Sequence, residues 1–143
     1  MKSLTINQIN LGDEATFIKT ITKDDVESFA AITEDRNPAH MDEEYASKTI
    51  FRRRIAHGML VGSLFSTIFG VMLPGLGSIY TKQSLKFTKP VYFEDTITAK
   101  VTVKEKNLDR NRVTFDCAAI NQDGDTVVVG EAEIMPPVKE VSL

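Results

Sequence analysis

Apolar and polar residues alternate in two parts of the chain, and this period of two predicts β-strands. Near the N-terminus the alternation covers Glu14 to Thr20 and predicts one short strand. The second half of the chain contains four more such segments, at about residues 78–88, 96–103, 112–117 and 126–135. Asp123-Gly124 lies between the last two segments and favours a hairpin turn, so these strands are expected to be antiparallel.

The stretch after the first strand is predicted to form a helix and then an ordered loop. Thr22 can act as an N-cap, and the apolar residues after it fall on one helical face, so a helix is predicted over Lys23 to Ile32. A residue before proline avoids the helical conformation, so Asn37-Pro38 predicts a loop from Glu34 to Met41. A short helix is expected around Glu43 to Lys48.

Residues Gly58 to Met72 are apolar on nearly every side of a helix and predict a buried helix that needs cover all round. The order strand, helix, buried helix and four antiparallel strands predicts an α+β domain in which a sheet wraps around one long central helix. A single domain is expected over residues 1–143, since 42% hydrophobic residues suffice for a core at this length. Sheet edges and a helix flank would remain open, so we expect pairing with a second subunit.

Composition and charge exclude several classes of protein. The single cysteine, Cys117, rules out an internal disulfide, does not suit a zinc cluster and indicates a reducing compartment. The first residues contain no apolar run of signal-peptide length, and polar residues and glycines interrupt the most apolar stretch, Ile55 to Leu76. We therefore expect a cytoplasmic protein without a membrane span. A net charge of −3 gives no general attraction for nucleic acid.

The first segment with residues suited to catalysis is the loop Asp35-Arg36-Asn37-Pro38-Ala39-His40. Its carboxylate and its imidazole lie five residues apart across a proline, a separation that lets both meet one small molecule. Water addition to an enoyl thioester needs a base for the water and an acid for C2, and such a pair can share these tasks. The alternative is structural: Asp35 caps a turn, Asn37-Pro38 shapes the loop and His40 is an ordinary surface or hydrogen-bonded histidine.

The second such segment starts at His57-Gly58, where the central helix is predicted to begin. Glycine lets a substrate approach the backbone, and free amides in the first helical turn can stabilise an enolate oxygen. For His57 a buried structural role is favoured over a catalytic one. Ser66 needs a partner on so apolar a helix, either a backbone carbonyl or a group in a pocket. Arg52-Arg53-Arg54 can contact the phosphates of a carrier, although such clusters are more often solvated.

Several segments together resemble one known family. They are Ala30 to Asp42, His57 to Leu60, Ser63 to Ser66, Leu73 to Tyr80, Gln83 to Phe87 and Pro90-Val91. On these segments the chain is similar to the MaoC-like (R)-specific enoyl-CoA hydratases, from about Thr22 to Pro136. The resemblance implies a hot-dog fold and a homodimer as the working unit.

The resemblance also implies roles for individual residues. Asp35 and His40 match the family's catalytic pair, and Gly58 matches the backbone amide that donates to the thioester carbonyl. Ser66 and Asn37 match residues that hold the loop or the substrate in place. Arg54 is a departure, because similar proteins often carry a proline there, so the entrance for the carrier is expected to differ.

The implied activity is reversible hydration of trans-2-enoyl-CoA to (R)-3-hydroxyacyl-CoA, with no metal and no other cofactor. A 3-hydroxyacyl-[acyl carrier protein] dehydratase is the main alternative, with the same chemistry on a protein-borne substrate. A hot-dog thioesterase is less favoured, since no separate carboxylate lies on the central helix. A non-enzymatic acyl-CoA sensor is less favoured because both acid–base residues are present and the length leaves no room for an effector domain.

Overall fold

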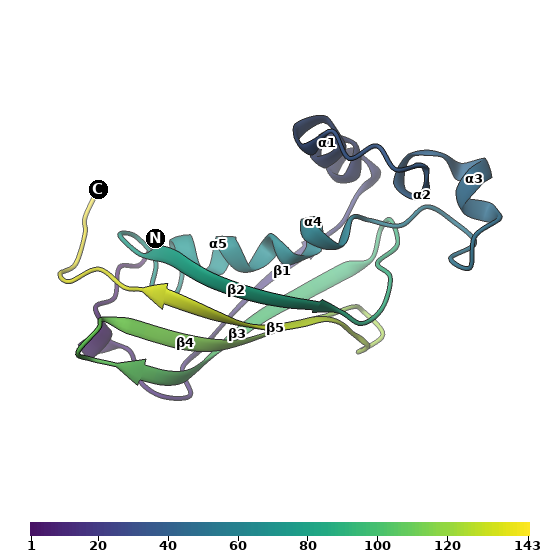
Figure 1. Ribbon diagram of the computed structural model, residues 1–143. Coiled ribbons are helices and arrows are strands. Elements are labelled where there is room, and N and C mark those ends of the chain that lie inside the picture. Colours follow the sequence, from purple (N-terminus) through teal and green to yellow (C-terminus); the bar gives the residue numbers. More distant parts are fainter.

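One five-stranded antiparallel sheet organises the chain (Figure 1). The computed structural model describes residues 1–143, and its strands lie side by side in the order β1-β3-β4-β5-β2. They are β1 (Glu14–Thr20), β2 (Ile79–Phe87), β3 (Thr96–Asn107), β4 (Arg112–Ile120) and β5 (Thr126–Met135). All five predicted strands are therefore confirmed. β1 and β2 form the two edges, each bonded to one neighbour.

The helices form two groups around this sheet. α4 (Gly58–Gly62) and α5 (Leu64–Val71) follow one another along one face of the sheet (Figure 1). α1 (Lys23–Thr33), α2 (Pro38–Met41) and α3 (Glu43–Ser47) extend past the end of the sheet, and a short 3-10 helix, Ile6–Gln8, precedes β1. None of these helices is long and apolar enough to cross a membrane.

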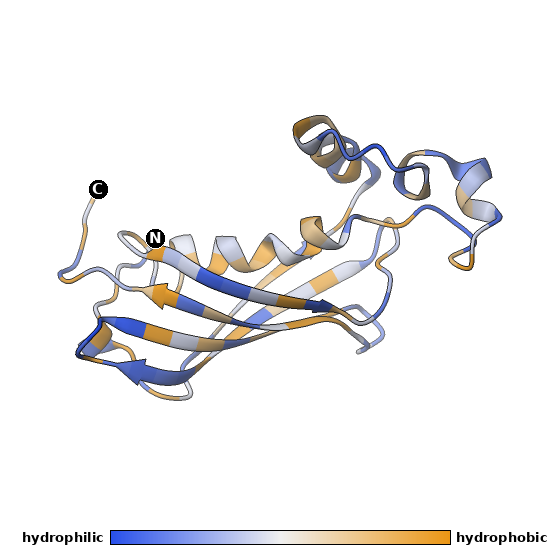
Figure 2. Cartoon of the chain, viewed as in Figure 1, coloured by the Kyte–Doolittle hydropathy of each residue, from blue (hydrophilic) through white to orange (hydrophobic).

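The core lies between α5 and the sheet, as the alternation along the strands dictates. In β4, Val113 and Phe115 are fully buried, whereas Thr114 between them is half-buried. Figure 2 shows this alternation of hydrophobic and hydrophilic residues along the strands. From α5, Phe65 and Phe69 are buried as well, and the Phe69 ring lies 4.9 Å from the Phe115 ring. Burying one such side chain contributes about 1.5–3 kcal/mol, so these contacts hold the central helix on the sheet.

The predicted central helix is confirmed, but its cover differs from the prediction. Ser63 separates it into α4 and α5. Met59, Ser63, Ser66 and Gly70 are exposed, and their spacing of three or four residues places them in one line along the helix. We call this line the open stripe. The expectation of cover on every side is wrong within one chain, because the sheet reaches only one side of the helix.

The predicted loop from Glu34 to Met41 is only partly a loop, because α2 occupies its second half. Asn37 keeps an extended conformation before the proline, with φ −53° and ψ 130°. Its side chain accepts a 3.0 Å hydrogen bond from Ala39 N and so caps the helix. Proline suits the first position of a helix, where no N–H donor is needed. The proline that was expected to prevent a helix therefore begins one.

Candidate active site

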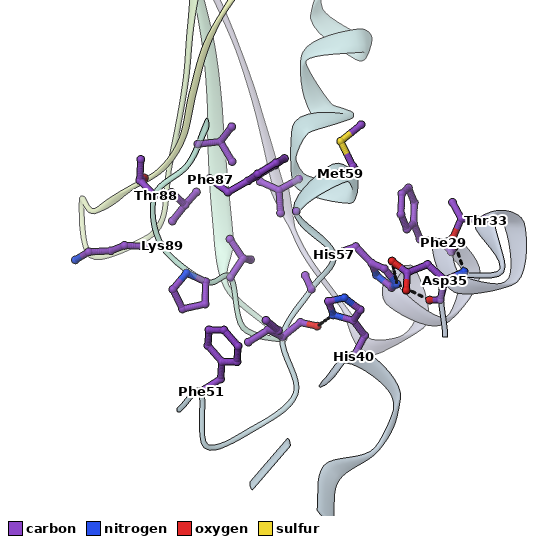
Figure 3. A pocket seen from close by; sticks show the side chains of 18 residues that line it. Phe29, Thr33, Asp35, His40, Phe51, His57, Met59, Phe87, Thr88 and Lys89 are labelled. Atoms are coloured by element: carbon purple, nitrogen blue, oxygen red, sulfur yellow. Dashed lines mark hydrogen bonds and ion pairs between the residues drawn. The ribbon is translucent and has the colours of Figure 1, made fainter. Parts of the chain in front are cut away.

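A cavity of about 720 Å³ lies where the α1–α3 segment meets the start of α4 (Figure 3). Eighteen residues line it, and ten of them are hydrophobic. Asp35, His40, His57 and Gly58 belong to this lining. Its apolar members include Phe29, Phe51, Ile55, Val61, Phe87 and Val128. A mostly apolar cavity of this size with a few polar groups has the character of a small-molecule site.

The end of α1 presents Asp35 to this cavity. Glu34 adopts the left-handed conformation, with φ 64°, and this ends the helix. Thr33 Oγ1 accepts a 3.1 Å hydrogen bond from Asp35 N, and Asp35 Oδ1 accepts one of 3.2 Å from Asn37 N. The Asp35 side chain is 52% exposed and lies beside His57 in Figure 3. Asn37 is not in the cavity lining, so it shapes the loop without contacting the cavity.

His40 is held in one orientation by a backbone carbonyl. Its Nδ1 lies 2.7 Å from Ile55 O, and because a carbonyl only accepts, Nδ1 carries the proton of the neutral ring. Nε2 is therefore free to accept a hydrogen bond. Burial lowers the pKa of His40, as do the charges of His57 and Arg54, whereas the bond to Ile55 and the charge of Asp35 oppose this shift. The net shift is downward, so His40 is neutral at pH 7.

His57 connects the two members of the predicted catalytic pair. It is 2% exposed, and its Nε2–H donates to Asp35 O over 2.9 Å. Its ring stacks on His40 with 3.9 Å between ring centroids. The expected burial of His57 is confirmed, but its contact with both residues was not foreseen from the sequence. The only sequence signal was its position directly before Gly58.

Gly58 brings the start of α4 to the cavity lining. As the first residue of α4 it donates to no carbonyl of its own helix. A Cβ at this position would lie 2.8 Å from Cδ1 of Phe87, so only glycine fits here without a shift of that ring. Ser66, in contrast, is exposed on the open stripe and does not line the cavity of its own chain.

Asp35, His40 and His57 each place one potential metal ligand within 4.8 Å of the others. Two of the four imidazole nitrogens already bond to backbone carbonyls, and His57 Nδ1 is buried. This leaves His40 Nε2 and the carboxylate, fewer ligands than the three or four protein groups that hold zinc. The same spacing suits a water molecule, which can bridge two acceptors with bonds of about 2.8 Å each.

Comparison with known proteins agrees with this site and this fold. The family model of the MaoC-like domain matches residues 9–122 of this chain. This range contains Asp35, His40, Gly58 and the central helix. The chain belongs to the MaoC-like dehydratase family. As a MaoC-like protein it has the predicted α+β hot-dog architecture, a sheet wrapped around a central helix.

The relatives of this MaoC-like chain include hydratases and a dehydratase. The (R)-specific enoyl-CoA hydratase of Rhodospirillum rubrum is 44% identical, over 92% of this chain and 90% of that protein. The structure of the unliganded R-hydratase PhaJ1 of Pseudomonas aeruginosa has a TM-score of 0.93 and 42% identity, over 99% of this chain and 90% of that one. The mitochondrial 3-hydroxyacyl-[acyl-carrier-protein] dehydratase FERN of Solanum lycopersicum is 35% identical, over 94% of this chain and 82% of that protein.

Proposed function

We propose that this MaoC-like protein is an (R)-specific enoyl-CoA hydratase, a hydro-lyase that converts trans-2-enoyl-CoA into (R)-3-hydroxyacyl-CoA and back. The observation that carries the proposal is the meeting of Asp35, His40 and Gly58 in the lining of one mostly apolar cavity. Each of these groups matches one need of the reaction: activation of water, transfer of a proton, and stabilisation of the thioester oxygen.

In the proposed mechanism one water lies between the Asp35 carboxylate and His40 Nε2. The dyad, Asp35 and His40, removes a proton from this water as the water oxygen bonds to C3. The enolate oxygen accepts a hydrogen bond from Gly58 N–H. A proton returns to C2 on the same face, so the whole of H₂O is added. No electrons are gained or lost, so the reaction needs no redox cofactor. Acid–base groups contribute about 10²–10⁴-fold and one oxyanion donor about 10²–10³-fold, so both are needed for efficient turnover.

The working unit in this proposal is a homodimer. Edge strand β2 has no partner on its outer side, and its Ile79, Tyr80 and Phe87 are between 40% and 53% exposed. The open stripe of the central helix is also uncovered. A second copy that covers the edge and the stripe would shield apolar surface and unpaired backbone groups together. Cytoplasmic location and a single domain over residues 1–143 stay predictions.

A spectrophotometric hydration assay tests the function. Crotonyl-CoA and a longer trans-2-enoyl-CoA are both expected to lose their enoyl absorbance when the protein is added. Coupling to an (R)-specific 3-hydroxyacyl-CoA dehydrogenase is expected to consume the product, because the dyad delivers water to a fixed face of the enoyl group. Turnover only with the (S)-specific coupling enzyme contradicts the proposal.

The alternatives predict other outcomes of the same assay. A dehydratase of fatty-acid synthesis would hydrate the enoyl group much faster on acyl carrier protein than on CoA. A thioesterase would release free CoA, which a thiol reagent detects, without hydration. A sensor would bind the thioester and leave it unchanged.

A further inference from the structure

The segment Arg54-Ile55 holds the segment Ala39-His40 through three hydrogen bonds. Ile55 N donates to Ala39 O over 3.1 Å, and Ile55 O receives His40 Nδ1–H over 2.7 Å. Arg54 Nε donates to His40 O over 2.6 Å. The first two bonds use only the backbone of residue 55, so many residues can serve there. The third bond requires the side chain of Arg54.

Arg54 also joins His40 to two other parts of the molecule. Its side chain is only 10% exposed, and one terminal nitrogen lies 3.7 Å from Glu27 Oε1 in α1. Its guanidinium carbon lies 4.8 Å from the centroid of the Phe93 ring, in the segment between β2 and β3. The guanidinium therefore lies between the His40 segment, α1 and the connection from β2 to β3.

Stability alone does not explain why the charged guanidinium of Arg54 is buried. Removing a charged group from water costs several kcal/mol before any contact offsets it. The terminal nitrogen near Glu27 is buried and makes no hydrogen bond, and Glu27 is itself 44% exposed and shared with Lys23 at 3.8 Å. A well-packed apolar side chain is often as stabilising at such a place. The cation therefore calls for a reason beyond packing, and its short bond to His40 O supplies one.

We propose that Arg54 is a positioning residue for the hydration reaction, which holds the His40 backbone so that Nε2 meets the water shared with Asp35. The inference rests on the proposed function for its effect on turnover. A displacement of about 1 Å at an acid–base group can lower a rate by as much as about 10²-fold, so one bond at the His40 carbonyl has a measurable effect.

The positive charge of Arg54 has a second effect that a purely mechanical support lacks. The charged or titratable groups around His40 are Asp35 from the loop after α1, His57 before α4, and Arg54. Arg54 favours the neutral form of His40. If that charge is removed, the charge of Asp35 remains and favours the protonated form. The pKa of His40 should then rise.

The test compares Arg54→Met with Lys23→Met as a matched control. Both remove one cation near Glu27, but Lys23 is 61% exposed and, unlike Arg54, makes no hydrogen bond to His40. The chain has two histidines, so NMR titration resolves His40 once His40→Gln has assigned it. Arg54→Met is expected to raise the His40 pKa and to lower kcat about tenfold, with the acid limb of the kcat profile moved to higher pH. Lys23→Met is expected to change neither.

Arg54→Lys separates charge from geometry, because it keeps the cation but not the planar guanidinium. It should retain the wild-type titration of His40 and recover only part of kcat. The proposal is overturned if Arg54→Met and Lys23→Met have the same His40 pKa and the same kcat. If Arg54→Met does not fold, full kcat in Arg54→Lys overturns it. The NMR readout needs no turnover, so a wild-type protein that hydrates no enoyl-CoA refutes the proposed function while the hold on His40 is still measured.

Discussion

At the scale of single residues, the atoms around Asp35 and His40 fix how these two side chains are presented. Ile55 O binds the Nδ1 proton of His40 and thereby leaves Nε2 as an acceptor. Thr33 and Asn37 set the backbone and the carboxylate of Asp35 through two local hydrogen bonds. His57 donates to the backbone of one residue and stacks on the ring of the other. The two side chains therefore meet with little freedom left in either.

The first prediction concerns this dyad. Asp35→Asn and His40→Gln are each expected to lower kcat by about 10²-fold or more, the usual effect of losing an acid–base group. Stability should change little, since Asp35 is half exposed and Asn keeps the oxygen that accepts from Asn37 N. Steady-state kinetics and circular dichroism measure both effects. The double variant should lose little beyond the worse single variant, because groups that act as one unit are not additive.

A purely structural loop role makes the opposite prediction. It requires lost thermal stability with most of the hydration rate intact. Near-normal kcat in either folded single variant would remove the dyad from the mechanism.

The second prediction is a pH dependence that follows from the lowered pKa of His40. A lowered pKa means that His40 stays neutral at pH values where an ordinary histidine, with a pKa near 6.5, is already protonated. If neutral His40 accepts the proton of water, the acid limb of kcat/KM lies below pH 6.5. The pH–rate profile measures this, and an acid limb above pH 6.5 contradicts it.

The same shift affects folding stability. The folded state takes up a proton on His40 less readily than the unfolded state. The contribution of neutral His40 to folding stability is therefore fully present above the pKa of His40 in the unfolded state, and it is lost as pH falls through the pKa of His40 in the folded state. Urea unfolding of wild type and His40→Gln between pH 7 and pH 5 separates this contribution. The variant should lose less stability than wild type over that range.

At the scale of elements, the start of α4 must approach both the cavity and strand β2. Added Cβ atoms show how closely it packs: one at Gly58 would lie 2.8 Å from Phe87, and one at Gly62 would lie 2.8 Å from Leu85. Both glycines are one helical turn apart and face β2. Only Gly58 lines the cavity, so the two positions separate close packing from catalysis.

The third prediction uses this pair. Gly58→Ala and Gly62→Ala should both destabilise the fold by about 1–3 kcal/mol, the usual range for overpacking. Only Gly58→Ala should also lower kcat, by about 10²-fold, because its methyl group displaces the amide from the enolate oxygen. Thermal unfolding and hydration kinetics measure the two effects. Equal kcat in the two variants would exclude the Gly58 amide as the oxyanion donor.

At the scale of the whole molecule, the exposed edge of the sheet and the open stripe lie next to each other, because α4 packs directly on β2. Exposed apolar residues on β2 and small residues on the stripe form one surface that a second copy can cover. Gly70 belongs to this surface, and a Cβ there would meet no atom within 4 Å. A larger side chain at Gly70 therefore fits the single chain but not a covered surface.

The fourth prediction is that wild type is a dimer at low micromolar concentration and that Gly70→Arg shifts it toward monomer. Leu108→Arg adds the same charge at an exposed leucine of the β3–β4 turn and should leave the dimer intact. Light scattering measures the mass. A wild-type monomer with full activity would refute the dimer as the working unit.

The sequence by itself determined the elements and the family. Alternation places the strands, a Thr22 cap begins α1, and an apolar run becomes the central helix. These signals are local, since each depends on residues within a few positions of one another. The resemblance carried by the Asp35–His40 loop and His57-Gly58 also named the family correctly.

Only the tertiary structure decided how distant segments meet. Strand order β1-β3-β4-β5-β2 depends on pairing between residues far apart, such as Phe17 with Ala99, which no local pattern encodes. The exposure of Ser66 was missed because a helix apolar all round does not reveal which side the sheet leaves open. The bonds of His57 to Asp35 and of Arg54 to His40 link residues 22 and 14 positions apart. Such contacts exist only once α1 to α3 fold back against the start of α4, so they are properties of the folded molecule and not of any segment.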